Sequence, residues 1–143
     1  MTQTDVVSAV EANQALGRQF FEEQDRLRGG PAEALCAPGY EVVLGGFPAM
    51  NREGHEGFAK AFYAGFPDMK HHFEQVIATD SAVVVRFVRR GTHTGHLSGI
   101  PPSGRPAVIA AHVILHVAEG KVTRLFGIFD EAGMLRQLGV LPQ

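Results

Sequence analysis

Apolar and small residues recur every three or four positions from residue 4 to about residue 28, which is the period of an α-helix. The glycine pair Gly29-Gly30 then supplies a stop signal. The pattern predicts one long amphipathic helix with a single apolar stripe. The stripe consists of Val6, Val10, Gly17, Phe20, Phe21 and Leu27.

Two shorter helices are predicted next, with a brief strand at residues 40–44 between them. Pro31 suits the first turn of a helix over residues 31–36, because an N–H would be unpaired there in any case. Asn51 is in position to cap the second helix, which Pro67 ends. The helical spacing of this second segment is carried by His55, Phe58, Ala59, Phe62 and Phe66.

From residue 71 onward the pattern changes to that of β-strands. Residues 71–78, 81–97, 107–117 and 121–130 are rich in β-branched and aromatic residues, and short turns separate these segments. Turns this short allow only antiparallel pairing of consecutive strands. A last helix is predicted over residues 131–139.

This order of elements predicts an α+β fold in a single domain over residues 1–143. We expect a curved, cone-shaped sheet of antiparallel or mixed pairing, with about three N-terminal helices on its concave face and a short C-terminal helix. Because a long sheet twists and curls, the helices would enclose a cavity between themselves and the sheet.

The composition is that of a soluble globular protein and argues against several classes of partner. Of 143 residues, 45% are hydrophobic and 20% are charged, and the net charge is −2 without a basic block. We therefore expect no nucleic-acid partner and no membrane partner. The single cysteine, Cys36, cannot form an internal disulfide, and the N-terminus lacks the apolar core of a signal peptide. We expect a cytoplasmic protein.

One acidic residue, Asp130, stands where the last predicted strand meets the last helix. A three-residue turn at residues 118–120, with Gly120 in the left-handed conformation, would place His112 opposite Phe126. The same register would place Val108 opposite Asp130. A two-residue turn would shift the pairing by one position and move His112 to the other face. We favour the three-residue turn. It gives one face that contains Val108, His112, Ile114, Phe126, Ile128 and Asp130.

An acid on an apolar, concave face has two interpretations. Its position directly before a helix favours a helix cap when the pattern is considered alone. Alternatively, burial raises the pKa of a carboxyl toward the range of a general base. In that case His112 could hold the proton, orient the acid or donate a hydrogen bond to an enolate oxygen.

The second half of the chain carries five short motifs in a fixed order. They are FPD at residues 66–68, GTHTG at 91–95, GIPPSG at 99–104, EGKV at 119–122, and FD…GMLRQLG at the end. Together they resemble the SnoaL-like polyketide cyclase (ester cyclase) family, which has the nuclear transport factor 2-like cone fold. The resemblance covers roughly residues 60–142. Two positions depart from the family pattern: Phe126 stands where Trp is common, and PPSG where PPTG is usual.

The resemblance implies a cofactor-independent enzyme that closes a ring by an intramolecular aldol reaction. Asp130 occupies the position of the family's general acid/base, so it would remove a proton next to the carbonyl groups and leave an enolate. His112 is the second candidate catalytic residue. The predicted substrate is a hydrophobic small molecule with carbonyl groups. Its pocket would be lined by His93, Phe126, Ile128, Ile114, Val108, Phe58, Phe62 and Phe20.

Two other functions stay open at this point. The fold could hold a small apolar ligand without catalysis, with Asp130 as a cap only, or it could catalyse a related isomerisation or hydrolysis. No metal site is predicted, because paired histidines lie on opposite sides of a strand or too far apart along it. We expect Arg86, Arg89 and Arg90 at the solvent, at an interface or in ion pairs.

A homodimer is the expected assembly. The convex face of the predicted sheet would expose the apolar residues Val84, Val88 and Val113, and a second copy of the chain would cover them.

Overall fold

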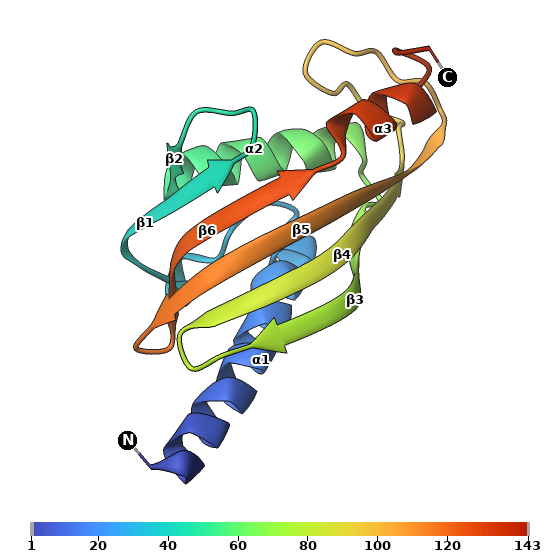
Figure 1. Cartoon of the computed structure of the whole chain (residues 1–143). Helices are drawn as coiled ribbons and strands as arrows, with labels where there is room; N and C mark the ends of the chain where they lie inside the picture. The colour runs from blue at the N-terminus through green and yellow to red at the C-terminus, as the bar shows by residue number, and fades with distance from the viewer. Residues whose placement is uncertain (1, 143) are drawn as a thin grey trace.

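One curved, open sheet of six strands is the main element of the computed structural model, which describes residues 2–142 (Figure 1). The strands lie in the order β2-β1-β6-β5-β4-β3, and all neighbours are antiparallel except β1 and β6, which are parallel. Their bounds are β1 Cys36–Leu44, β2 Met50–Asn51, β3 Lys70–Ala78, β4 Ala82–Thr92, β5 Pro106–Ala118 and β6 Lys121–Phe129.

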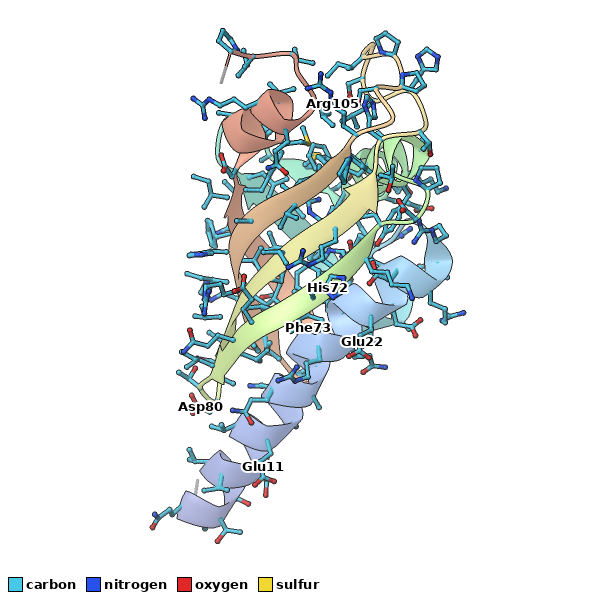
Figure 2. The ribbon with its side chains drawn as sticks, turned by 90° about the vertical axis from the view of Figure 1, so that its right-hand side faces the viewer. Glu11, Glu22, His72, Phe73, Asp80 and Arg105 are labelled. Atoms are coloured by element: carbon cyan, nitrogen blue, oxygen red, sulfur yellow. The ribbon has the colours of Figure 1, made fainter. Side chains whose placement is uncertain are left out.

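In the described part of the chain, two helices cover the inner face of the sheet and a third follows its last strand. α1 (Gln3–Leu27) packs on β3 and β4, α2 (Arg52–Gly65) contacts β1 and β2, and α3 (Glu131–Gln137) contacts β5. Figure 1 shows α1 and α2 behind the sheet and α3 at the end of β6. Figure 2 shows α1 along one side of the sheet, with Glu11 and Glu22 pointing away from it.

The α+β class and the long first helix are confirmed, whereas two predicted boundaries are wrong. Residues 31–36 form only a 3₁₀ turn at Glu33–Leu35, and β1 already begins at Cys36, so two helices rather than three cover the inner face. β4 ends at Thr92, which pairs with Pro106, instead of at residue 97. Beyond this pair His93 bonds to Arg105 and Gly104 through its backbone and closes the loop between the strands. Residues 93–105 form a loop instead.

The buried side chains form two groups. One lies between α1 and the sheet and includes Phe20, and the other joins α2, α3 and the 93–105 loop and includes Phe66. Phe58 and Phe129 pack against both groups. A cavity lies at this junction.

The β5–β6 hairpin has a different register from the predicted one. Glu119 (φ 53°) and Gly120 (φ 75°) are both left-handed, and Ala118 pairs with Lys121, so the turn has two residues. A β-bulge at Thr123 then adds one further residue on β6. The two shifts together move the pairing by two positions, so the side chains keep their predicted faces but change their partners.

His112 consequently lies opposite Ile128 rather than Phe126. The backbone N–H of Asp130 donates to the Ala110 carbonyl at 2.9 Å, and the predicted pair of Asp130 with Val108 is wrong as well. The shared face of these residues is the outer face of the sheet, not the concave one, because β5 buries the alternate set of side chains.

The outer face exposes five large aliphatic side chains, with 40% to 63% of their surface accessible. They are Ile77 (51%), Val84 (40%), Val108 (40%), Ile114 (41%) and Ile128 (63%). Val113 does not belong to this face as predicted; it is 5% exposed and packs in the core under α1.

Candidate functional site

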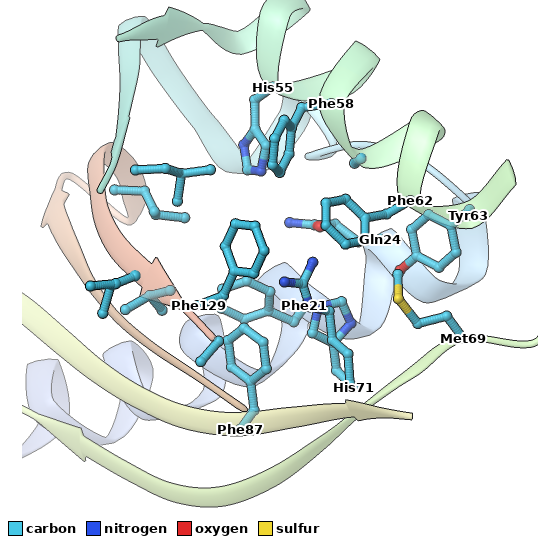
Figure 3. A pocket seen from close by; sticks show the side chains of 17 residues that line it. Phe21, Gln24, His55, Phe58, Phe62, Tyr63, Met69, His71, Phe87 and Phe129 are labelled. Carbon is cyan, nitrogen blue, oxygen red and sulfur yellow. The ribbon is translucent and has the colours of Figure 1, made fainter. Parts of the chain in front are cut away.

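A cavity of about 50 Å³ lies between α1, α2 and the inner face of the sheet (Figure 3). Its walls are mostly aromatic and aliphatic, and polar side chains reach it from four elements. They are Gln24 on α1, His55 and Tyr63 on α2, His71 on β3 and Arg89 on β4. A few convergent polar groups in an apolar cavity are the usual composition of a ligand-binding or active site.

His71 and Asp25 form a hydrogen-bonded pair beside the cavity. His71 Nδ1 lies 2.8 Å from Asp25 Oδ1, and the His71 backbone N–H donates to Asp25 Oδ2 at 2.9 Å. The Tyr63 hydroxyl also donates to Asp25 Oδ1, at 2.6 Å. Because an ionised carboxylate can only accept, His71 Nδ1 carries the ring proton and Nε2 keeps a free lone pair. The pair therefore presents a base that a carboxylate orients.

Burial and hydrogen bonding set the charges of this group. Burial raises the pKa of Asp25, but the bonds from His71 and Tyr63 outweigh it, so the pKa of the carboxyl lies below its ordinary value. Burial lowers the pKa of His71 by more than Asp25 raises it. Burial and the bond to Asp25 both raise the pKa of Tyr63. Around pH 7 the site thus holds a carboxylate, a neutral imidazole and a protonated phenol.

Arg89 brings a positive charge into the same cavity. Its guanidinium carbon lies 4.5 Å from the ring centre of Phe62 and 5.1 Å from that of Phe129. Burial lowers the pKa of Arg89 to about 10, so the side chain stays charged at neutral pH. Two aromatic faces hold the guanidinium in place through cation–π contacts.

Two buried nitrogen atoms in this cavity have no hydrogen-bond partner among residues 2–142. They are Arg89 Nε and Gln24 Nε2, and Gln24 is only 4% exposed. A buried donor without a partner costs about 1–3 kcal/mol, so such a group in a native fold calls for an explanation. Acceptor oxygens on a bound molecule are one such explanation.

An aromatic wall separates this cavity from a second pocket nearer the surface. Phe58, Phe62 and Phe129 line both spaces, and their rings contact one another edge to face or tilted, with centres 5.2 to 6.2 Å apart. The outer pocket has a volume of about 260 Å³ and is completed by α3 and the 93–105 loop. These three rings form the boundary that the two spaces share.

The structure places Asp130 outside this cavity. Its carboxylate accepts a hydrogen bond from the Gly133 backbone N–H at 2.8 Å and caps α3, and the side chain is exposed. Asp130 and His112 do lie together, with Ile128, in a shallow depression on the outer face. Their predicted position inside a concave cavity is wrong, because the face that carries them is the solvent-facing one. Their catalytic roles remain predictions.

The other predicted pocket residues fall into three groups. Phe58 and Phe62 line the inner cavity, and Ile128 borders it only at the edge, because its side chain is 63% exposed on the outer face. The remaining outer-face residues, Val108, Ile114 and Phe126, do not line it.

Phe20 and His93 are core residues with no accessible surface. Phe20 packs against Phe21 and Tyr40. His93 Nδ1 accepts from the Ser103 backbone N–H at 3.1 Å and lies 2.9 Å from the Ser103 hydroxyl, so it pins the 93–105 loop.

Most polar residues of the cavity were missed by sequence reasoning, although two patterns could have found some of them. Gln24 and Asp25 continue the apolar stripe of α1 by one helical turn after Phe20 and Phe21. Arg89 follows the buried alternate residues of β4, contrary to the expectation of a solvent or ion-pair position. A polar residue in a buried series is the informative exception. His71 had no such signal, because a bulge after Phe73 interrupts the alternation of β3.

Two further classes of site are not found in the described residues. None of the helices between residues 2 and 142 is long and apolar enough to span a bilayer. The same residues contain no cluster of three or more potential metal ligands.

The fold is shared with solved structures of bacterial proteins. A putative hydroxylase, AclR from Streptomyces galilaeus, superposes with a TM-score of 0.84 at 19% identity, covering 94% of this chain and 89% of that one. A putative SnoaL-like polyketide cyclase from Jannaschia sp. CCS1 gives 0.80 at 20% identity, with coverage of 93% and 95%. IdmH, a putative polyketide cyclase from Streptomyces antibioticus, gives 0.71 at 29% identity, with coverage of 91% and 97%. No curated protein matches the sequence.

The molecule is thus an α+β protein with an open, curved sheet and an aromatic cavity that contains a histidine–aspartate pair. The sequence model of the SnoaL-like polyketide cyclase family matches residues 17–138 of this chain. The chain belongs to this family, as its motifs indicate.

Proposed function

We propose that the protein is a cofactor-independent enzyme that removes a proton next to a carbonyl group, with His71 as the base. The observation that carries this proposal is the 2.8 Å bond between His71 Nδ1 and Asp25 Oδ1, which leaves the lone pair of Nε2 available beside the cavity. Asp25 acts as a positioning residue, because it fixes the tautomer and orientation of the ring.

The chemistry follows from the charges around His71. Nε2 takes a proton from the carbon between two carbonyl groups, and the electron pair of the C–H bond moves to give an enolate. The Arg89 guanidinium and the Gln24 amide, both without partners in the cavity, would donate to the developing oxyanion. The enolate carbon then attacks a second carbonyl carbon of the same molecule. The resulting alkoxide recovers the proton from His71, which balances the aldol closure.

The shape of the site supports an elongated, apolar substrate. The inner cavity of about 50 Å³ admits little more than the reacting carbonyl groups, whereas pockets for drug-sized ligands measure about 300–1,000 Å³. The outer pocket adds about 260 Å³ beyond the aromatic wall. A polyketide-like molecule could place its reactive end inside and its apolar remainder outside.

Exchange of the acidic C–H proton of benzoylacetone, a 1,3-diketone, tests the proposal. In D₂O the wild-type protein should accelerate exchange as followed by NMR, and His71→Gln should slow the protein-dependent rate by about 10²–10⁴-fold. The matched control is His72→Gln, which changes the exposed neighbour on the same strand. Equal rates for His71→Gln and wild type would contradict the proposal. No exchange by any form would favour the ligand-binding alternative.

The pH profile gives a second test of the same base. Since burial lowers the pKa of His71, the rate should rise with pH along a limb centred below about 6.5 and then level off. Asp25 raises the pKa of this ring, so Asp25→Asn should move the limb to lower pH as well as slow the reaction. A limb that moves to higher pH in Asp25→Asn would contradict the assignment.

A homodimer and a cytoplasmic location complete the proposal. The exposed aliphatic residues of the outer face, among them Ile114 and Ile128, support burial against a second copy. Sedimentation analysis should find a dimer for the wild type and a monomer for Ile128→Lys. A wild-type monomer at micromolar concentration would contradict this assembly.

A further inference from the structure

A second histidine, His55, enters the cavity from the first turn of α2. It is 7% exposed and lines the cavity together with His71 (Figure 3). Its Nδ1 lies 2.9 Å from the hydroxyl of Tyr40 on β1, and the two rings stack with centres 6.0 Å apart. The mechanism described so far makes no use of this pair.

The hydrogen bond to Tyr40 fixes which nitrogen of His55 carries the proton. Tyr40 is 4% exposed, and its hydroxyl has no other hydrogen-bond partner within residues 2–142. Burial raises the pKa of Tyr40, so the hydroxyl keeps its hydrogen and must place it on an acceptor. That acceptor is His55 Nδ1, and a neutral imidazole that accepts at Nδ1 carries its proton on Nε2.

The charge of His55 is fixed by its neighbours on three other elements. Tyr40 on β1 offers a donor, and Arg89 on β4 and His71 on β3 face the ring across the cavity. Within residues 2–142, no carboxylate is hydrogen-bonded to it. Burial, followed by the charge of Arg89, lowers the pKa of His55 to about 4. The ring is a neutral N–H donor at physiological pH.

His55 and His71 are therefore opposite tautomers beside one cavity. His71 gives its Nδ1–H to Asp25 and keeps a lone pair on Nε2, whereas His55 accepts at Nδ1 and keeps a proton on Nε2. We propose that His55 is a further catalytic residue, whose neutral Nε2–H donates a hydrogen bond to the substrate carbonyl oxygen while His71 removes the adjacent proton. This inference rests on the proposed function.

With these roles for His71 and His55, the proton and the charge are both accounted for in the enolisation step. His71 Nε2 gains the proton, the substrate oxygen gains negative charge, and His55 only strengthens an existing hydrogen bond. A neutral imidazole is too weak an acid to transfer its proton, so it stabilises the enolate without consuming it. Neutral histidines polarise carbonyl groups in this way in enzymes that form enediolates. Tyr40 is the positioning residue that sets the tautomer.

Nitrogen-15 NMR of the histidine rings tests the tautomers without any substrate. At neutral pH we expect the proton of His55 on Nε2 and the proton of His71 on Nδ1. Tyr40→Phe should remove the preference of His55 while leaving that of His71 unchanged. A proton on Nδ1 of His55 in the wild-type protein would overturn the proposal, whatever the exchange assay gives.

Benzoylacetone exchange then tests the catalytic role. His55→Ala should lower kcat by about 10²–10³-fold with a small change in KM, and His55→Gln, which retains an N–H donor, should recover part of the loss. His72→Gln is the control, and circular dichroism verifies that each variant is folded. If wild type exchanges the probe and folded His55→Ala matches its rate, this inference alone fails. If wild type shows no exchange, the proposed function fails and this role of His55 fails with it.

Discussion

At the scale of single residues, Asp25 and Asp130 carry the same carboxylate in different surroundings. Asp25 accepts from His71 and Tyr63 beside the cavity, whereas Asp130 accepts from the Gly133 backbone N–H at an exposed helix start. Desolvation is what makes a carboxylate or its partner useful in proton transfer. Only Asp25 has that environment, so the geometry favours the His71–Asp25 pair over the acid that the family motif indicates.

Two substitutions of Asp130 separate its capping role from a catalytic one. Asp130→Asn keeps a good N-cap acceptor and should change the free energy of unfolding by less than about 0.5 kcal/mol, whereas Asp130→Ala should lower it by about 1 kcal/mol. Neither should slow benzoylacetone exchange. Urea denaturation and the exchange assay measure the two effects. A fully stable Asp130→Asn protein that has lost exchange would return the role of base to Asp130.

The neutral state of His55 predicts how stability depends on pH. The pKa of a histidine is about 6.5 in an unfolded chain and that of His55 is about 4 in the fold, so the unfolded chain binds the proton first. This contribution to stability is complete above about pH 6.5 and is lost as the pH falls toward 4, by an amount on the order of 3 kcal/mol. Urea denaturation across this range measures it.

His55→Asn should reduce that pH dependence. A remaining slope of the same sign is expected from His71, whose pKa burial also lowers. A slope in His55→Asn that equals the wild-type slope would show that His55 does not titrate as inferred.

At the scale of elements, the sequence predicts well what depends on local periodicity. The stripe of α1 and the strands from β3 to β6 follow from spacing alone, because each buries one face. The β5–β6 register could not be predicted, since a left-handed Glu119 and a bulge at Thr123 each shift it by one residue. Local spacing does not determine which face of the sheet α1 and α2 cover, because that depends on tertiary packing. The face predicted from the sequence was the wrong one, so Asp130 was predicted in a cavity although it lies at the surface.

The contact of α1 with β4 gives a prediction at this scale. A Cβ on Gly17 would lie 2.7 Å from Val83 Cγ1, so Gly17→Ala should lower the free energy of unfolding by about 1–3 kcal/mol through overpacking. That loss opposes the gain of about 1 kcal/mol from better helix propensity. Gly57→Ala on α2 is the matched control, because a Cβ there meets nothing within 4 Å, and it should stabilise.

A double-mutant cycle with Val83→Ala checks that the clash is local. Trimming Val83 should remove most of the cost of Gly17→Ala, which urea denaturation of the four proteins would show. Additive effects would mean that α1 does not approach β4 as closely as the structure places it.

At the scale of the whole molecule, the interior is divided into an inner cavity and an outer pocket, and in the proposed enzyme this division would govern which substrates fit. The inner cavity holds the polar groups, the outer pocket is walled by α2, α3 and the 93–105 loop, and three phenylalanines stand between them. Such an arrangement places chemistry and size selection in different parts of the fold. It also explains how one reaction could accommodate different substrates by changes outside the polar cavity.

Phe129→Ala should join the two spaces and shift selectivity toward longer substrates. We expect the ratio of exchange rates for dibenzoylmethane over acetylacetone to rise by about tenfold, because the larger diketone then reaches His71 without ring rotation. Some activity on both probes should be lost, since Phe129 also contacts the Arg89 guanidinium at 5.1 Å. The free energy of unfolding should fall by roughly 3 kcal/mol.

Phe126→Ala is the control for this experiment, because Phe126 is the nearest phenylalanine of the same strand and lies on the opposite, outer face. It removes the same group of atoms without opening the wall, so the ratio of rates should stay at the wild-type value. An equal rise in both variants would assign the effect to general loosening of the fold. No rise in Phe129→Ala would mean that substrates reach His71 by another route, and the two pockets would then not form one binding site.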